Sequence, residues 1–420
     1  MKATPETTIR DGQQPRPRIA VPRTFQSLVD YPMFRQLWLA MMATSISQWT
    51  AQVTFGWLAL VLTDSARFVG IVSFMSGLPF LVIALPAGVY IDRLDRRKIL
   101  LTAQSSAALL GIVMAIVVLA GWVQPWHLLV AAFLNGSFLS VLNPTMQSVI
   151  PGIVGKDGLT NSVGLMSAGQ NMTRIVGPSM AGVTIGFSST GFAFLLIAVT
   201  LLVAVLLISK VRVPDRAASV TAKGWQAAFS GLQIIWNRGD LRVLFVLACL
   251  PPLLIFPYIQ FLNIFARDIL EIGAQGLGVL TAASGVGAVI GSLMMASRTF
   301  RRGDGIRQIR IILLYALGVI GVAFSTTLWI TLPLLVMGGM LGGTYMSTNN
   351  ALLQLRIEDE VRGRVMATYM MTFGLLPLGA LPMGLVADAL GIQLAVALGS
   401  TSCTALILVI ALHSKSLRKI

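Results

Sequence analysis

Nine long stretches of this chain contain no lysine, arginine, aspartate or glutamate, and this feature constrains the fold more than any other. A helix that crosses the hydrocarbon core of a membrane needs about 20 mostly apolar residues, and every stretch is at least that long. Backbone polar groups inside lipid must be paired internally, so such runs are predicted to be helices. The stretches are 36–63, 68–91, 99–155, 175–209, 243–266, 272–297, 311–355, 365–387 and 389–414.

Some of these regions are long enough for two crossings. Turn-forming residues break the stretch 99–155 near Gly121 and the stretch 311–355 near Ser325, and residues 158–209 also hold two spans. The total is twelve spans, so the chain is predicted to be an all-α membrane protein. Charged residues make up only 11% of it and its mean hydropathy is +0.81, whereas soluble domains carry about 25% charged residues.

The 31 lysines and arginines are distributed unevenly between the loops. If the N-terminus is cytoplasmic, all of them except Arg67, Arg174 and Arg267 fall in the terminal segments or in loops on that same side. Cytoplasmic loops carry the excess of basic residues in membrane proteins. We therefore predict a multi-pass protein of the bacterial inner membrane with both termini in the cytoplasm. The same distribution explains the formal net charge of +15 without a nucleic-acid partner.

The longest polar interruption after the N-terminal tail divides the twelve spans into six and six. It contains an amphipathic piece, from Trp225 to Trp236, that is predicted to lie on the membrane surface. The predicted organisation is a disordered cytoplasmic tail (1–30), an N-terminal six-helix bundle (31–211), a cytoplasmic linker with an amphipathic helix (212–240), a C-terminal six-helix bundle (241–414) and a cytoplasmic C-terminus (415–420).

The two halves resemble each other weakly. Arg67 and Arg267 both follow the first span of their half. Ala181-Gly182-Val183 also occupies the position that Met383-Gly384-Leu385 occupies in the second half. Internal repeats of this kind place the substrate site of a carrier near the membrane midplane, between the halves.

The segment after the second span contains Gly88, then Asp92-Arg93, then a basic cluster, with Asp95 where a second glycine would be usual. This pattern resembles the signature loop of the major facilitator superfamily, which implies two pseudo-symmetric six-helix bundles and a close helix contact at Gly88. It also implies ion pairs that close the cytoplasmic side and break when that side opens. The alternative is that these charges only anchor the loops. The predicted gating residues are Gly88, Asp92, Arg93, Arg96, Arg97, Glu358, Arg362 and Arg364.

Three further segments narrow the resemblance to one branch of that superfamily. They are Pro86-Ala87-Gly88 with the following loop, Arg174 to Pro178 with Ala181-Gly182, and Leu355-Arg356 with Val361 to Val365. They are similar to the transmembrane secretion effector branch, which includes enterobactin exporters and macrolide efflux proteins. The resemblance implies a secondary active transporter that exports an amphiphilic small molecule, drug-like or siderophore, by alternating access. Gly177-Pro178 is similar to the element that kinks a helix in drug–proton antiporters.

The predicted membrane interior contains one charge and several amides. None of the 16 acidic residues lies in the middle of a span, although proton-coupled carriers normally use a carboxylate there. Arg174 is in the middle of its span, where an arginine costs about 3 kcal/mol. It either binds an anionic group of the substrate or has a structural role. The candidate substrate-binding residues are Arg174, Gln48, Gln52, Gln170, Asn171, Gln260 and Asn263.

Other classes of protein fit these residues less well. The chain has two cysteines and two histidines, far apart in sequence, which predict neither a disulfide framework nor a metal site, and no cofactor is expected. The sequence contains no nucleophile–base spacing that would favour an enzyme, and no soluble output domain that would favour a sensor. A lysophospholipid flippase remains an alternative function. The expected partners are a small-molecule substrate and membrane lipid, with no nucleic acid, and the chain is expected to act as a monomer.

Overall fold

The computed structural model describes residues 25–83, 95–211, 224–296 and 303–413, and this described part is helical with no β-strand. Its first half consists of α1 (Gln26–Asp30), α2 (Pro32–Thr63), α3 (Ala66–Val82), α5 (Arg96–Leu119), α6 (Pro125–Phe187) and α7 (Thr190–Ser209). Helix α6 makes two passes, because Gly155 has φ 64° and ψ −166° and breaks the helix there. Glycine suits this position because it adopts positive φ without a steric penalty.

The second half begins with the helix α8 (Gly224–Asn237), which falls within the predicted amphipathic segment of the linker. The first span of this half is interrupted, because Pro251, Pro252 and Pro257 cannot donate helical hydrogen bonds. The elements of that span are α9 (Gly239–Leu254), η2 (Phe256–Phe261), α10 (Leu262–Ile264) and η3 (Phe265–Ile269). They are followed by α11 (Gly273–Ala296), α12 (Asp304–Phe324), α13 (Leu328–Arg356), α14 (Asp359–Met370), η4 (Met371–Gly374), α15 (Leu375–Leu390) and α16 (Ile392–His413).

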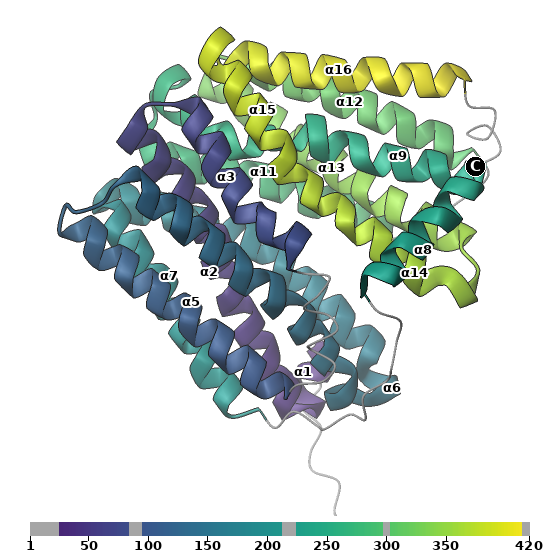
Figure 1. Ribbon diagram of the computed structural model, residues 1–420, viewed down its shortest axis with the longest axis horizontal. Coiled ribbons are helices and arrows are strands. Elements are labelled where there is room, and N and C mark those ends of the chain that lie inside the picture. The colour runs from purple at the N-terminus through teal and green to yellow at the C-terminus, as the bar shows by residue number, and fades with distance from the viewer. Residues whose placement is uncertain (1–24, 84–94, 212–223, 297–302, 414–420) are drawn as a thin grey trace, which may run out of the picture.

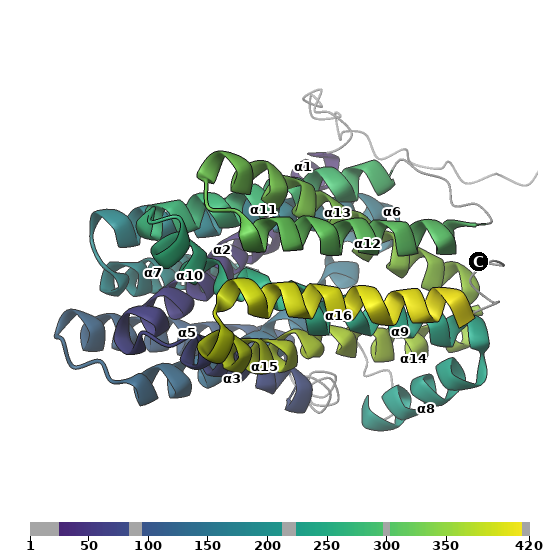
Figure 2. The ribbon, with the colours of Figure 1, turned by 90° about the horizontal axis from the view of Figure 1, so that it is seen from above.

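These helices form the predicted all-α membrane fold. By length and composition, nine helical segments of the described residues can cross a membrane. Helices α2 and α3 and the second pass of α6 run beside them and complete the twelve predicted spans. Figure 1 shows the helices from α1 to α7 grouped on one side and those from α8 to α16 on the other, and Figure 2 shows the long helices running along a common direction.

The first described turn of the chain differs from the predicted disordered tail. Residues Gln26–Asp30 form a short helix in which Ser27 is buried. The backbone N–H of Ser27 donates a hydrogen bond to Asn161 Oδ1 at 3.1 Å, and its hydroxyl donates to the carbonyl oxygen of Gly158 at 3.4 Å. These contacts with α6 hold Gln26–Asp30 in place, although the sequence predicts that these residues belong to the disordered tail. Residues 1–24 lie outside the described part.

We call the end of the molecule where α7 stops and α8 starts the linker end, and the other end the opposite end. Helix α5 begins at the linker end with Asp95 as its N-cap, whose carboxylate accepts a hydrogen bond from the backbone N–H of Arg97 at 2.9 Å. At the opposite end Trp122, Trp126 and Trp329 have exposed side chains. Tryptophan is enriched where a membrane surface meets water, so these residues are in the expected place for one boundary.

The two halves meet at two crossings between glycine-containing helices. In the first, between α3 and α15, a Cβ atom on Gly70 would lie 2.7 Å from the carbonyl oxygen of Ala380, and one on Gly384 would lie 2.8 Å from that of Ala66. Such distances leave no room for a side chain, so the backbones touch directly. Small residues permit this close approach of helices inside membranes.

The second crossing, between α6 and α11, repeats the geometry of the first. A Cβ atom on Gly182 would lie 2.8 Å from the carbonyl oxygen of Ala274, and one on Gly278 would lie 2.9 Å from that of Pro178. The tripeptides around Gly182 and Gly384, which the sequence pairs as a repeat, are therefore at equivalent contacts of the two halves. Close packing of glycine against glycine explains why this position is the same in both repeats.

We expect Gly182→Ala and Gly384→Ala each to open the opposite end. The added methyl group would lie 2.8 Å from a backbone oxygen of the other half, so the helices must separate. Overpacking of this kind costs about 1–3 kcal/mol, which shifts an equilibrium by roughly fivefold or more. Spin labels at Trp122→Cys and Trp329→Cys, with Cys249 and Cys403 replaced by alanine, should report longer distances between the halves.

The matched control for this experiment is Gly164→Ala in the same helix as Gly182. A Cβ atom on Gly164 meets nothing within 4 Å. The distances between the two spin labels in Gly164→Ala should therefore equal those in the parent protein. If Gly182→Ala and Gly384→Ala also leave the distribution unchanged, the glycine crossings do not hold this end closed.

Candidate functional site

A cavity of about 760 Å³ lies between the two halves. One wall comes from α2, α3 and the first pass of α6. The other wall comes from the end of α9, from η2, and from the chain between the end of α14 and the start of α15. The lining reaches from Phe55 and Gly56, in the C-terminal third of α2, to Gln147 and Met370, which lie toward the linker end. This volume is within the range of about 300–1,000 Å³ that is usual for small-molecule sites.

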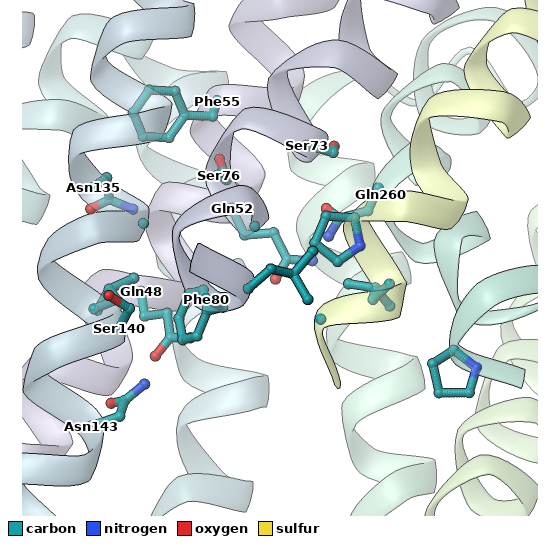
Figure 3. Close-up of a pocket in the computed structure, with 18 of the residues that line it drawn as sticks. Gln48, Gln52, Phe55, Ser73, Ser76, Phe80, Asn135, Ser140, Asn143 and Gln260 are labelled. Carbon is teal, nitrogen blue, oxygen red and sulfur yellow. The ribbon is translucent and has the colours of Figure 1, made fainter. Parts of the chain in front are cut away.

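The N-terminal half supplies most of the polar groups of the cavity. Gln48 and Gln52 lie four residues apart on α2, so they share one helix face. A second row of polar side chains lies on α6, and α3 adds two hydroxyls; Figure 3 shows many of these side chains around the cavity. These further polar residues are Asn135, Ser140, Asn143 and Gln147 on α6, and Ser73 and Ser76 on α3.

The C-terminal half supplies a mainly apolar wall. Phe256 is held there by edge-to-face contacts with Tyr315 and Tyr345, with ring centroids 5.5 and 6.2 Å apart. Tyr345 is itself fixed, because its hydroxyl donates a hydrogen bond to the carbonyl oxygen of Leu247 at 2.9 Å. The other lining residues of this wall are Pro252, Gln260, Met370, Met371, Gly374, Leu376 and Pro377.

Contacts between the halves close the opposite end. Buried Asn263, on α10, donates a hydrogen bond to the carbonyl oxygen of Gly56 on α2 at 2.6 Å. Arg267 donates to the carbonyl oxygen of Leu60 at 3.2 Å and forms an ion pair with Asp64 at the end of α2. The Asp64 carboxylate is 81% exposed, so solvent screens this pair and most of the stabilisation comes from the buried contacts.

A carboxylate from the C-terminal half also caps a helix of the N-terminal half. Asp388, near the end of α15, accepts hydrogen bonds from the hydroxyl of Ser65 and from the backbone N–H of Arg67, both at 3.1 Å. Ser65 is the N-cap of α3, so Asp388 lies at the positive end of that helix dipole. The conformation is therefore closed at the opposite end, with the cavity lined from mid-helix toward the linker end.

Arg174 does not line the cavity but lies next to a residue that does. Its guanidinium carbon is 5.2 Å from the centre of the Trp49 ring, at a distance suited to a cation–π contact. It is also close enough to the buried Tyr258 and Tyr315 of the C-terminal half to interact with them electrostatically. Among the described residues the guanidinium has no hydrogen-bond partner. The only mid-span charge of the sequence thus lies behind the cavity wall, between the halves.

The other predicted binding residues divide into two groups. Gln48, Gln52 and Gln260 line the cavity. Asn263 is used instead in the contact with Gly56. Gln170 is exposed and Asn171 half-buried, and neither is part of the lining.

The predicted kink residues have close neighbours from other helices. A Cβ atom on Gly177 would lie 2.6 Å from that of Trp49, so this glycine lets α6 contact α2. Pro178 has no N–H to donate to the carbonyl oxygen of Arg174, four residues earlier. That oxygen faces Gly285 of α11, whose Cβ position is 3.0 Å away. The described backbone deviates from helical φ/ψ within α6 at Gly155, not at these two residues.

Three of the predicted gating residues contact other described residues in this conformation, and their gating role stays a prediction. Arg96 and Arg97 donate to the carbonyl oxygens of Ser148 and Ser209, at 3.4 and 2.5 Å. Glu358 forms an ion pair with Arg238, at 3.2 Å. Arg362 and Arg364 are exposed on α14. Gly88, Asp92 and Arg93 lie outside the described residues.

The sequence analysis missed several residues of the site. Ser73, Ser76, Asn135, Ser140, Asn143 and Gln147 line the cavity but are not among the predicted binding residues. Asn135, Asn143 and Gln147 are separated by eight and by four residues on an otherwise apolar helix, and this spacing was a usable signal. No sequence pattern pointed to Asp388 as a cap for α3, because its partner is more than 300 residues away.

Comparison with solved structures shows the same fold. The structure matches that of a nucleoside transporter, NupG (D323A mutant), with a TM-score of 0.72 at 12% identity, over 91% of this chain and 100% of the other. It also matches an inward-facing and occupied bacterial homologue of the human lysosomal transporter Spinster, with a TM-score of 0.69 at 13% identity, over 93% and 96%. Identities this low show similarity of fold.

Comparison of sequences finds several bacterial transporters. The chain is 24% identical to the staphyloferrin A transporter of Staphylococcus aureus, over 83% of this chain and 87% of the other. It is 23% identical to macrolide efflux protein A of Streptococcus pyogenes, over 85% and 88%. It is 26% identical to the multidrug efflux pump Tap of Mycolicibacterium fortuitum, over 81% and 86%.

The family comparison covers nearly the whole chain. The model of the transmembrane secretion effector family matches residues 25–420, from the first described helix to the C-terminus. The match spans both halves and therefore both walls of the cavity. The chain is a multi-pass membrane transporter that belongs to the transmembrane secretion effector family of the major facilitator superfamily.

Proposed function

We propose that this protein is a secondary active transporter that exports amphiphilic small molecules, drug-like compounds or siderophores, by alternating access. The observation that carries this proposal is the cavity between the halves, which extends toward the linker end while inter-half contacts close the opposite end. A carrier needs a central site that is reached from one side at a time. The described cavity has the position and volume for such a site.

The charges at the linker end support the assignment of that end to the cytoplasmic side. Basic residues cluster in the segments on that side, including Arg238 and Arg242 at the start of α9 and Arg307 and Arg310 at the start of α12. The excess of basic residues marks the cytoplasmic side of membrane proteins. In this orientation both termini are cytoplasmic, in the bacterial inner membrane, and the cavity takes up its substrate from inside the cell.

The names of the relatives support export of amphiphiles. One is called a transporter of the siderophore staphyloferrin A, and two others are called efflux proteins for macrolides and for multiple drugs. An amide-bearing wall facing an apolar wall suits molecules that have both polar and apolar surface. The two halves of one chain together form both walls of the cavity, so we propose that the monomer is the working unit.

Alternating access requires the opposite end to open and the linker end to close. In our proposal Asp388 leaves the N-terminus of α3, Arg267 leaves Asp64, and the glycine crossings separate. At the linker end Arg96 and Arg97 then approach Glu358 and the start of α14. These exchanges replace one set of inter-half contacts by another, which keeps the two states close in free energy.

Transport is tested first by flux in proteoliposomes. We expect radiolabelled chloramphenicol, an uncharged amphiphile, to cross the membrane faster in liposomes that contain the purified protein than in empty liposomes. Comparing this flux with and without an imposed pH gradient reveals proton coupling. Asn135→Trp should reduce this flux by about tenfold or more, because an indole fills the cavity and removes a hydrogen-bonding group.

The control for this experiment is Phe187→Trp, which introduces the same indole on the same helix at a side chain that is 79% exposed. Its flux should match that of the parent protein, and the melting temperature of both variants checks that they fold. Equal flux from Asn135→Trp and from the parent protein would remove the cavity from the transport path.

A second experiment tests the cap on α3. Asp388→Ala removes the acceptor for Ser65 and Arg67, and loss of a helix cap costs about 1 kcal/mol, so the opposite end should open roughly fivefold more often. We expect Ser73→Cys, in a background without Cys249 and Cys403, to react correspondingly faster with a membrane-impermeant maleimide added from the outside.

Asp240→Ala is the matched control for this substitution. Asp240 pairs with Arg238 of its own half at 3.2 Å, so its loss leaves the contacts between the halves intact. Labelling should proceed at the parent rate in this variant. Equal rates for Asp388→Ala and Asp240→Ala would mean that the cap contributes nothing to closure.

A further inference from the structure

The hydrogen-bonding groups of the cavity are divided unequally between its walls. Gln260 is the single polar lining side chain from the C-terminal half among the described residues, whereas the N-terminal half contributes eight. These eight are Gln48, Gln52, Ser73, Ser76, Asn135, Ser140, Asn143 and Gln147. The cavity therefore has one wall on which amides and hydroxyls lie among apolar side chains such as Phe55, Phe80 and Leu139, and one wall that is almost wholly apolar.

Every polar group of the described lining is neutral. No lysine, arginine, histidine, aspartate or glutamate is among these residues. The amides of Gln48, Gln52, Asn135, Asn143 and Gln147 form no hydrogen bond with another described residue, so their donors and acceptors are available to a ligand. A side-chain amide offers both kinds of group, which match a hydroxyl, a carbonyl or another amide.

Charged ligands lack a counterion on these walls. Carboxylates and phosphates are usually bound by arginine or lysine, and cations by carboxylates, and the described lining has neither. Moving an isolated charge from water into such a site is unfavourable. Arg174, stacked on Trp49 behind the wall, adds a positive potential that further disfavours cations.

We propose, on the basis of the proposed transport function, that the substrates are amphiphiles without net charge. They bind with a hydroxyl-, carbonyl- or amide-bearing edge against α2, α3 and α6, and with an apolar edge against Phe256, Met370 and Met371. Methionine side chains adapt to ligands of different shape, so the apolar wall tolerates variety. The amides of the other wall determine which polar edges are accepted.

Three probes of similar size but different charge test the charge selectivity. Radiolabelled chloramphenicol is bound to the protein in nanodiscs, and displaced with unlabelled chloramphenicol, with anionic fluorescein or with cationic rhodamine 123. We expect fluorescein and rhodamine 123 to require at least tenfold higher concentrations than chloramphenicol. Failure of chloramphenicol to bind, or stronger competition by either charged probe, overturns the proposal.

The same assay separates this proposal from the proposed function and from a role of Arg174. Binding of chloramphenicol without protein-dependent flux in liposomes would contradict transport while leaving the selectivity of the site intact. A preference for fluorescein that disappears in Arg174→Gln would assign selectivity to the guanidinium and overturn the neutral-substrate proposal.

A matched pair of neutral ligands tests the polar wall. Thiamphenicol and florfenicol differ by one hydroxyl, which is a fluorine in florfenicol. We expect Gln48→Met with Gln52→Met, which keeps side-chain size and removes the amides, to weaken thiamphenicol binding about tenfold. The loss for florfenicol should be smaller because it makes one hydrogen bond fewer.

Two further variants complete the comparison. Gln26→Met, at an exposed position on α1, should leave both affinities unchanged. Phe256→Leu, on the apolar wall, should weaken thiamphenicol and florfenicol by the same factor, because it removes apolar contact and no hydrogen bond. If the double glutamine variant loses the same affinity for both ligands, or loses none, the amides do not hydrogen-bond to the polar edge of the ligand.

Discussion

Direct backbone contact between the two halves at the opposite end determines the shape of the whole molecule. Four glycines, in two equivalent pairs, let α3 approach α15 and α6 approach α11 so closely that no side chain fits between them. With these helices in contact at one end, the halves diverge toward the other, and the cavity is the space that results. Its location, volume and access therefore depend on residues that do not line it.

Polar contacts between the halves add to this closure, and contacts of this kind can be broken and formed again when the conformation changes. The cap that Asp388 makes on α3 and the hydrogen bond from Asn263 to Gly56 join chain segments that belong to different halves. Each is strong enough to select one arrangement and weak enough to be exchanged for others, as contacts of about 1 kcal/mol are. The basic cluster near the start of α5 and Glu358 at the start of α14 provide groups for such an exchange at the linker end.

The uneven polarity of the cavity gives the two halves different tasks. The N-terminal half offers unpaired amides, and the C-terminal half offers aromatic, methionine and proline side chains. Although the repeats share a fold and equivalent crossings, they have diverged at the surface that lines the cavity. Arg174 belongs to this asymmetry, since it extends from the N-terminal half toward buried tyrosines of the C-terminal half without entering the cavity.

The gating and binding predictions depended on position along single helices, and this is where they were incomplete. Gln48, Gln52 and Gln260 were recognised because an amide inside an apolar run is conspicuous by itself, and they do line the cavity. Gln170 and Asn171 met the same criterion but lie outside the lining. Local composition shows that a residue is polar within a span; it does not show which face of the helix meets the other half.

The sequence by itself determined the class of fold, the number of spans and the family, because hydrophobic length, loop charge and the signature segments are local properties of the chain. It also identified Gly182 and Gly384 as equivalent. Only the tertiary structure decided that these glycines meet Gly278 and Gly70, that Asp388 caps a helix far away in sequence, and that Arg174 lies behind Trp49. Those facts depend on the packing of helices from different halves, and such packing is encoded by the combined shape of many side chains rather than by any one segment.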